Sequence, residues 1–170
     1  MKSKSFVTSF FIVLLMVVVG CDKKGVQPVA IDDKKDKCDI CNMSVTDNQF
    51  ATEVILENGK AIKFAEIGCM YKWMEQHQED KLQAKFVRDY NSKDWVELEK
   101  ATFVYDKDIS TPMAYNMISF QNKKDAETFV SKSKGKLLTS QDLENHRWEI
   151  NKNMMIKMHE ELGEGMNHSH

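Results

Sequence analysis

Hydrophobic and polar positions along the chain predict two similar groups of elements. In the first group, residues 50–56 and 60–64 are rich in strand-forming side chains and flank Asn58-Gly59, a pair that favours a two-residue hairpin turn. Apolar residues at helical spacing over 66–78 predict an amphipathic helix, and 84–90 alternates again as a strand. The first group is therefore strand, strand, helix, strand.

The same order follows in the second half of the chain. Residues 101–105 and 116–120 are strand-like, 123–133 has a helical pattern with Gly135 as its predicted C-cap, and 136–138 forms a short strand. We therefore predict an α+β fold in which two tandem ββαβ modules share a core. The predicted boundaries are 38–92 for the first module and 93–143 for the second.

A C-terminal helix completes the predicted fold. It is expected to begin at Ser140 as N-cap, with Leu143, Ile150 and Met154 as its buried stripe. Residues 144–170 comprise this helix and a polar tail that contains methionines and histidines. The tail is interpreted as a solvated, frayed helix end, with a loose copper-collecting arm as the alternative.

The first twenty residues predict export. Lys2 and Lys4 precede an uncharged run of about fifteen mostly apolar residues, which is typical of a secretory signal because a membrane span needs about twenty. The run ends at Val18-Val19-Gly20-Cys21, which resembles a bacterial lipobox, where cleavage precedes a cysteine that is then lipidated. We expect residues 1–20 to be a signal peptide and Cys21 the lipidation site. An uncleaved anchor helix and an ordinary signal peptide are the alternatives.

The mature chain is expected to be a tethered single domain. Residues 21–37 comprise the lipidated cysteine and a charged segment without a sustained apolar period, which predicts a flexible tether. Removal of residues 1–20 takes away two lysines and moves the net charge from −2 to about −4. That balance gives no reason to expect nucleic-acid binding.

Soft metal ligands are concentrated at two places in the chain. The run from Cys38 to Met43 holds two thiols and a thioether, and Met113 follows about seventy residues later in a polar loop. Thiolates and thioethers favour Cu(I) over hard cations. Thiols oxidise to disulfides outside the cytoplasm whereas thioethers do not, so this combination indicates copper handling in an oxidising space. The candidate metal ligands are Cys41, Met113, Cys38 and Met43.

Other interpretations of the Cys38–Cys41 pair remain open. A redox dithiol usually lies at a helix N-terminus, but the residues after Cys41 are poor helix formers. A zinc clip needs two more ligands, and beyond Cys69 the sequence has no paired histidines or second CxxC. A structural disulfide within the pair, or from either cysteine to Cys69, is the third alternative. Cys69 itself adjoins the apolar stripe of the first helix and is interpreted as a buried structural residue.

Several of these features occur together in a known family. They are the lipobox at Cys21, the run from Cys38 to Met43, Gly68-Cys69 in a helix preceded by Phe64, and the Thr111-Pro112-Met113 loop followed by Phe120. Together they resemble the NosL family of membrane-anchored copper-binding lipoproteins, which serve assembly of the copper centre in nitrous oxide reductase, an enzyme of denitrification. The resemblance extends over residues 18–143.

The resemblance implies a fold and a metal site. The fold has two ββαβ modules related to a domain of organomercurial lyase, and members bind one Cu(I) through cysteine and methionine. The family's key cysteine and its methionine in the second module fall on Cys41 and Met113, and Cys38 and Met43 complete the run. Glycine is usual in the family where this chain has Asn42 and Ala114. Asparagine tolerates positive φ well, whereas alanine does so poorly, so the backbone at Ala114 decides the geometry near Met113.

The resemblance also implies a chaperone and not an enzyme. Such a protein is lipid-anchored to the cell membrane on the periplasmic face or outer surface. It passes Cu(I) to the nitrous oxide reductase apoprotein, in concert with a membrane ABC-type assembly machinery. Two rival functions are a thiol–disulfide oxidoreductase that uses Cys38 and Cys41, and a copper-scavenging lipoprotein without a dedicated client.

Overall fold

In the computed structural model, four antiparallel strands and one helix form the first unit. β1 (Thr52–Leu56) and β2 (Ala61–Phe64) make the predicted hairpin, and β3 (Leu82–Arg88) pairs with the other side of β1. β4 (Trp95–Glu97) pairs with β3, so the strand order is β2-β1-β3-β4. The helix α1 (Ile67–Gln76) connects β2 to β3 and contacts both β1 and β2.

The second unit repeats this arrangement with three strands. β5 (Thr102–Tyr105) is central, and β6 (Met117–Phe120) and β7 (Lys136–Leu138) pair with it on either side. α2 (Lys123–Val130) connects β6 to β7, and the 3-10 helix η1 (Leu98–Lys100) precedes β5. The predicted α+β fold of two tandem ββαβ units is confirmed. β4 was not predicted from the sequence.

The C-terminal region differs from the single helix that was predicted. There are two helices, α3 (Ser140–Glu144) and α4 (Lys152–Asn167). The N-cap of α3 is Thr139, not Ser140: the Asp142 N–H donates to the Thr139 hydroxyl (3.3 Å), and the Thr139 N–H donates to the Asp142 carboxylate (2.8 Å). Such a reciprocal pair needs an acidic residue three positions after the cap, and only Thr139 has one there.

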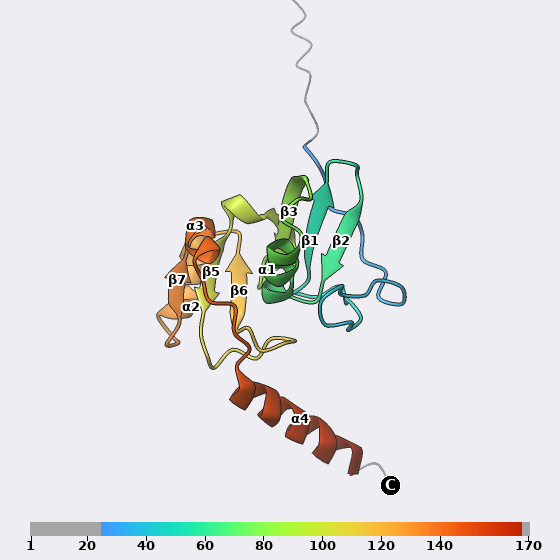
Figure 1. Ribbon diagram of the computed structural model, residues 1–170. Coiled ribbons are helices and arrows are strands. Elements are labelled where there is room, and N and C mark those ends of the chain that lie inside the picture. The colour runs from blue at the N-terminus through green and yellow to red at the C-terminus, as the bar shows by residue number, and fades with distance from the viewer. Residues whose placement is uncertain (1–24, 168–170) are drawn as a thin grey trace, which may run out of the picture.

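The predicted buried stripe of this helix is divided as well. Leu143 is buried, but Ile150 is 38% exposed in the segment between the two helices. Met154 is half-buried near the start of α4, which projects away from the two sheets (Figure 1). The predicted C-cap at Gly135 is also wrong, because α2 ends earlier, with Ser131 as its C-cap.

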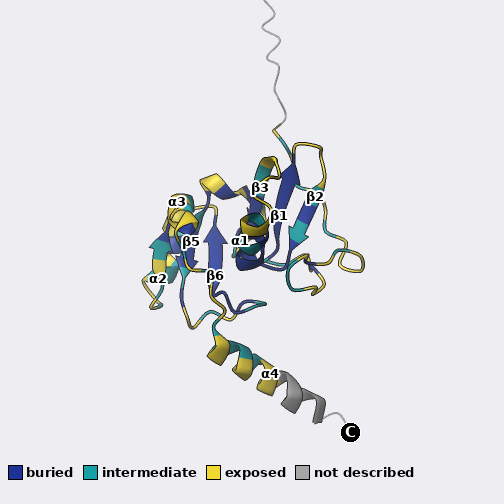
Figure 2. Cartoon of the chain, in the orientation of Figure 1, coloured by how far each residue is buried: buried dark blue, intermediate teal, exposed yellow. Residues whose placement is uncertain are grey.

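One apolar core joins the two units. Phe64 and Trp73 of the first unit and Phe103 and Met117 of the second belong to the same cluster of buried side chains. Figure 2 shows β1, β6 and part of α1 in the colour of buried residues, whereas the described part of α4 is exposed or half-buried. The helix α1 contacts β6 across this core, which places it between the two sheets (Figure 1).

Hydrogen bonds also fasten the two sheets together, where the chain leaving β3 meets β6. Ser119 forms a parallel bridge with Asp89, and its hydroxyl donates to the carbonyl of Arg88 (2.7 Å). The Ser119 carbonyl accepts the N–H of Tyr90 (2.8 Å), and the Asp89 carboxylate accepts the N–H of Gln121 (2.7 Å). The two units are thus held as one body by main-chain contacts as well as by the core.

Part of the predicted tether contacts the first sheet. The Val29 N–H donates to the Glu53 carboxylate (2.8 Å), and the Lys63 ammonium binds both the Asp36 carboxylate (2.6 Å) and the Ala30 carbonyl (2.6 Å). From Val29 onward, the segment that was expected to be flexible therefore makes specific contacts with β1 and β2.

The structure describes residues 25–167, and the side chains of residues 25–161. The predicted signal peptide and the lipidation site Cys21 lie outside this range. Among the described residues, no helix combines the length and the apolar composition that a membrane crossing requires.

Candidate metal centre

The Cys38–Cys41 pair lies in a tight turn and not on a helix. The Cys38 N–H donates to the carbonyl of Met43 (2.9 Å), and the Asn42 N–H donates to the carbonyl of Cys38 (2.8 Å). Asn42 adopts a φ of 60°, the left-handed conformation that asparagine accepts more readily than most residues. This turn brings the two thiols of the motif together, without the helix N-terminus that a redox dithiol commonly uses.

Cys69 approaches the same place from α1. It lies in the first turn of the helix and is buried. Its neighbour Gly68 faces the ring of Tyr115, so closely that a Cβ on residue 68 would lie 2.1 Å from a ring carbon. Only glycine leaves room for this contact, which sets the start of α1 directly against the loop before β6.

The three thiols form one cluster. The Sγ atoms of Cys38, Cys41 and Cys69 lie within 4.8 Å of one another. Three sulfurs bound to one ion at about 2.3 Å in a plane would lie roughly 4 Å apart, so a small contraction suffices to complete a three-thiolate site. Cys38 and Cys69 are buried and Cys41 is half-buried, and all three are free thiols. Soft thiolates favour Cu(I) and Zn²⁺.

Hydrogen bonds among the three sulfurs favour a thiolate at Cys38 and protonated thiols at Cys41 and Cys69. Hydrogen bonds from the thiols of Cys41 and Cys69 lower the pKa of Cys38 far below that of an ordinary thiol. The hydrogen bond to Cys38 raises the pKa of Cys41, and the pKa of Cys69 is raised for the same reason. A bound cation would displace these two protons, so metal binding should weaken as pH falls.

Met113 lies in the loop between β5 and β6, which bends sharply. Ala114 and Asn116 have φ of 54° and 59°. The Ala114 N–H donates to the Thr111 carbonyl (2.9 Å), and the Asn116 N–H donates to the Thr111 hydroxyl (3.1 Å). Ala114 therefore takes the conformation for which glycine is suited, and the backbone found here accommodates alanine in spite of its Cβ.

Glu66 connects this loop to α1. It is the N-cap residue of α1, and its Oε1 accepts the N–H of Met113 (2.6 Å). Its other oxygen, Oε2, has no hydrogen-bond partner among the described residues. Burial raises the pKa of Glu66 to about 7, because loss of hydration outweighs the contacts from Thr111, Met113 and Tyr115 that favour the charged form.

The four predicted ligands occupy different positions. Cys38 and Cys41 lie in the thiol cluster. The Met113 side chain is half-buried and packs against the core cluster that contains Cys38. The Met43 side chain is 42% exposed beside the turn, although its carbonyl is part of the turn. Whether the two methionines bind metal stays a prediction.

The sequence analysis did not include Cys69 among the metal ligands. Its burial on α1 agrees with the prediction, but its sulfur lies with the other two thiols. The available signal was the short distance in sequence between Phe64, which ends β2, and Cys69 in the first turn of α1. A cysteine in the first helical turn after a strand lies near the edge of that sheet, where the Cys38–Cys41 turn also lies.

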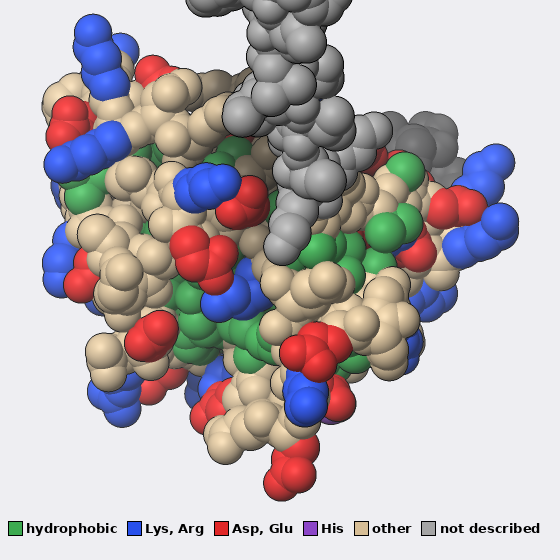
Figure 3. All heavy atoms as spheres, turned by 90° about the horizontal axis from the view of Figure 1, so that it is seen from above, with side chains coloured by type: hydrophobic (Ala, Val, Ile, Leu, Met, Phe, Trp, Pro, Cys, Tyr) green, Lys and Arg blue, Asp and Glu red, His purple; other side chains and the backbone are tan. Residues whose placement is uncertain are grey.

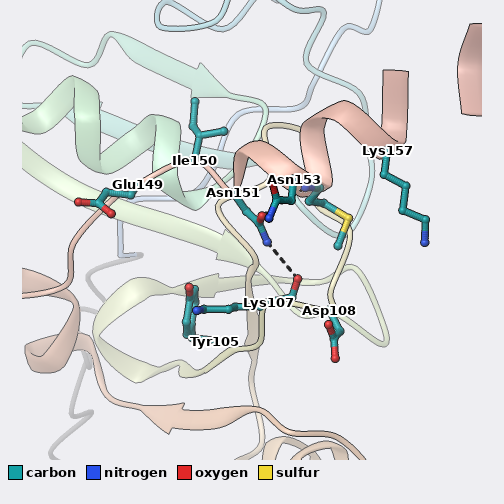
Figure 4. A pocket seen from close by; sticks show the side chains of 9 residues that line it. Tyr105, Lys107, Asp108, Glu149, Ile150, Asn151, Asn153 and Lys157 are labelled. Carbon is teal, nitrogen blue, oxygen red and sulfur yellow. Dashed lines mark hydrogen bonds between the residues drawn. The ribbon is translucent and has the colours of Figure 1, made fainter. Parts of the chain in front are cut away.

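The predicted tail contributes no residue to the thiol cluster within the described range. The segment before α4 is attached to the Met113 loop, since the Asn151 N–H donates to the Ala114 carbonyl (2.9 Å). Beside this segment lies a pocket of about 530 Å³, where the side-chain amide of Asn151 donates to the Lys107 carbonyl (3.2 Å; Figure 4). Polar and charged side chains dominate the lining, so we assign no soft-metal site there. His146 packs edge-on against the rings of Tyr105 and Trp148 and also lies outside the cluster.

The surface carries charges of both signs. On the face seen in Figure 3, basic and acidic side chains are interspersed around patches of apolar atoms. This agrees with a composition of 24 basic and 26 acidic residues. Such mixed charge is unlike the continuous basic stripe that binds nucleic acid.

Comparisons with known proteins agree with this fold. A family model described as NosL matches residues 28–148. Among solved structures, the chain is similar to the crystal structure of the copper chaperone NosL from Shewanella denitrificans, with 24% sequence identity and a TM-score of 0.58, over 66% of this chain and 92% of that one. A search of curated proteins found no match.

Proposed function

The chain belongs to the NosL family, and from this premise we propose that it is a membrane-anchored chaperone that delivers Cu(I) for the maturation of nitrous oxide reductase. The observation that supports this most directly is the cluster of three free thiols within 4.8 Å of one another. Such a set of soft donors suits Cu(I).

The chaperone would hold copper mainly through thiolates. Cys38 already has a lowered pKa, and copper would replace the protons of Cys41 and Cys69. Met113 supplies a thioether from the second unit, in line with the family's pattern, and Met43 offers a further thioether at the surface. The burial of Cys38 and Cys69 keeps solvent away from these two thiols.

Delivery is a ligand exchange. Cys41 is half-buried, so a ligand of the acceptor protein can approach copper on its side. The acceptor ligand binds as one thiolate leaves, the leaving thiolate takes up a proton, and copper stays Cu(I), so no electron is transferred. Lipidation at Cys21 would confine the carrier to the extracytoplasmic membrane surface, near an ABC-type assembly machinery and the reductase apoprotein.

A competitive Cu(I) titration of the purified full chain tests the site. The chain is kept reduced in detergent and competes with a chromogenic chelator, and Cys41→Ser and Met113→Ala are compared with wild type. Both variants should bind Cu(I) more weakly, and Cys41→Ser should show the greater loss. Met154→Leu, which changes a half-buried methionine on α4, is the matched control and should bind like wild type.

Two further measurements separate the rivals. Transfer of Cu(I) to the reductase apoprotein, followed by the absorbance of its copper centre, should require Cys41; tight binding without transfer would instead indicate a scavenger. Reduction of a disulfide-bonded test protein by the apo chain, at a rate unaffected by Met113→Ala, would support a thiol–disulfide oxidoreductase.

A further inference from the structure

Two glutamates of the first unit are almost fully buried and lie outside the thiol cluster. Glu53 is 0% exposed and Glu66 is 1% exposed, and each has an Oε2 atom with no hydrogen-bond partner among the described residues. They differ in which N–H group donates a hydrogen bond to their Oε1 atom. Oε1 of Glu53 accepts the N–H of Val29, in the segment before the domain, whereas Oε1 of Glu66 accepts the N–H of Met113.

Glu66 therefore spans the two parts of the proposed copper site. Its backbone caps α1, three residues before Cys69, and its carboxylate binds the main chain of Met113 at 2.6 Å. The cysteines all come from the first unit, and Met113 comes from the second. The ring of Tyr115 against Gly68 is a second close contact that joins the same two segments.

The hydrogen bonds within the loop do not include the N–H of Met113. Within the loop, Thr111 accepts the N–H groups of Ala114 and Asn116. The N–H of Met113 is directed out of the loop, and Glu66 is its acceptor. A half-buried N–H without an acceptor is unfavourable, so removal of the carboxylate should let the loop rearrange toward water and carry Met113 with it.

We propose that Glu66 is the positioning residue of the copper site: by accepting the N–H of Met113, it sets where the Met113 thioether lies relative to Cys69. This inference rests on the proposed function, because it concerns the same ion. Glu66 does not bind the ion and acts only through Met113. Outer residues that orient ligands in this way typically change metal affinity by roughly 10- to 100-fold.

The test is a double-mutant cycle on Cu(I) affinity in the full chain. Glu66→Leu keeps a side chain of similar size and removes the acceptor, and it is measured alone and together with Met113→Ala. Glu66→Gln keeps an acceptor and serves as the rescue variant. Glu53→Leu removes the carboxylate of the other buried glutamate and is the matched control. Chains labelled with [15N]methionine report the Met113 amide signal directly.

The proposal predicts that Glu66→Leu weakens Cu(I) binding about 10- to 100-fold, that Met113→Ala then adds little, and that Glu66→Gln binds nearly as wild type. Glu53→Leu should leave the affinity unchanged even where it alters stability. The Met113 amide signal should move strongly in Glu66→Leu and little in Glu53→Leu. Additive losses in the cycle, or an unchanged amide signal, would overturn the proposal. Absence of Cu(I) binding by the wild-type chain would overturn the proposed function instead.

Discussion

The two ββαβ units have the same order of elements, but they are elaborated at different connections. In the first unit a tight Asn58-Gly59 turn joins the two strands, and the strand-to-helix connection carries Glu66 and leads directly to Cys69. In the second unit the strand-to-helix connection is exposed, with Asn122 as N-cap, and the long connection between β5 and β6 carries Met113.

The two helices also differ in how far they are buried. Five residues of α1 are buried, including Gly68 and Cys69, whereas Ala126 is the buried residue of α2. The helix that lies between the sheets supplies one thiol of the cluster, and the helix on the outside covers its own sheet. Two units with the same order of elements can therefore build one asymmetric site when each extends a different connection toward the common core.

The largest expected effect concerns the thiolates of the first unit. Cys69→Ser should lower Cu(I) affinity by more than about 100-fold, because loss of a ligand should exceed the roughly 10- to 100-fold loss that follows from an outer residue. Competition with a chromogenic chelator measures it. Asp125→Ser, at the corresponding place in α2, is the control and should bind like wild type. Equal affinities of Cys69→Ser and wild type would show that Cys69 does not bind Cu(I).

The second-largest effect is expected at the contact between Gly68, at the start of α1, and the ring of Tyr115, in the connection between β5 and β6. Gly68→Ala would place a Cβ 2.1 Å from a ring carbon of Tyr115. We expect a loss of about 3 kcal/mol in the free energy of unfolding, measured with urea, because one of the two segments must move. Gly25→Ala, whose Cβ meets nothing within 4 Å, should be neutral. Similar midpoints for the two variants would contradict the close approach.

Glu66 makes the same junction sensitive to pH. Its pKa is raised from 4.5 to about 7 in the folded chain, mainly by burial. The folded state therefore binds the proton more tightly than the unfolded state, and the stability that this gives is complete below pH 4.5 and lost as pH rises through 7. The loss amounts to about 3 kcal/mol.

Urea unfolding of the apo chain between pH 4.5 and 8 measures this dependence. Glu66→Gln cannot ionise, so the difference in stability between wild type and Glu66→Gln should change by the stated amount over that range. Other carboxylates titrate equally in both proteins and cancel. A difference that is constant with pH would show that Glu66 is not the group responsible.

The smallest effect is expected at the turn that carries the first two thiols. Asn42 is exposed and has a φ of 60°, so Asn42→Ala should cost about 1 kcal/mol, whereas Asn42→Gly should be nearly neutral. Thermal unfolding of both variants measures the difference. An alanine variant as stable as wild type would mean that the backbone at residue 42 is not held in the left-handed region.

Sequence patterns predicted the elements that have enough residues to show a period. The helical spacing of Ile67, Met70 and Met74 located α1, and the turn at Asn58-Gly59 located the first hairpin. β4 was not predicted, and the separation of α3 from α4 depends on residues 145–151, where Trp148 stacks on Tyr71 of α1. Thr139 and Ser140 are both good caps, and only the reciprocal bond with Asp142 distinguishes them.

The site was predicted less completely than the fold, because a metal site depends on contacts between distant segments. The pairing of Cys38 with Cys41 is local and was visible in the sequence. The position of the Cys69 thiol beside the other two depends on the direction of α1 after β2 and on the close approach that Gly68 allows. The hydrogen bond between Glu66 and Met113 is harder still to predict from the sequence, because a glutamate before a helix usually indicates a solvated N-cap.

The bonds between Ser119 and the chain leaving β3 have a consequence for the kinetics of copper transfer. Because they join the two units, any opening between the units to release the proposed copper ion would first have to break them. Spontaneous dissociation should therefore be slow, and exchange should proceed by attack of an incoming ligand at the half-buried Cys41. The transfer rate should then rise with the concentration of the acceptor, as in an associative substitution, and the carrier would release its copper mainly on meeting a partner.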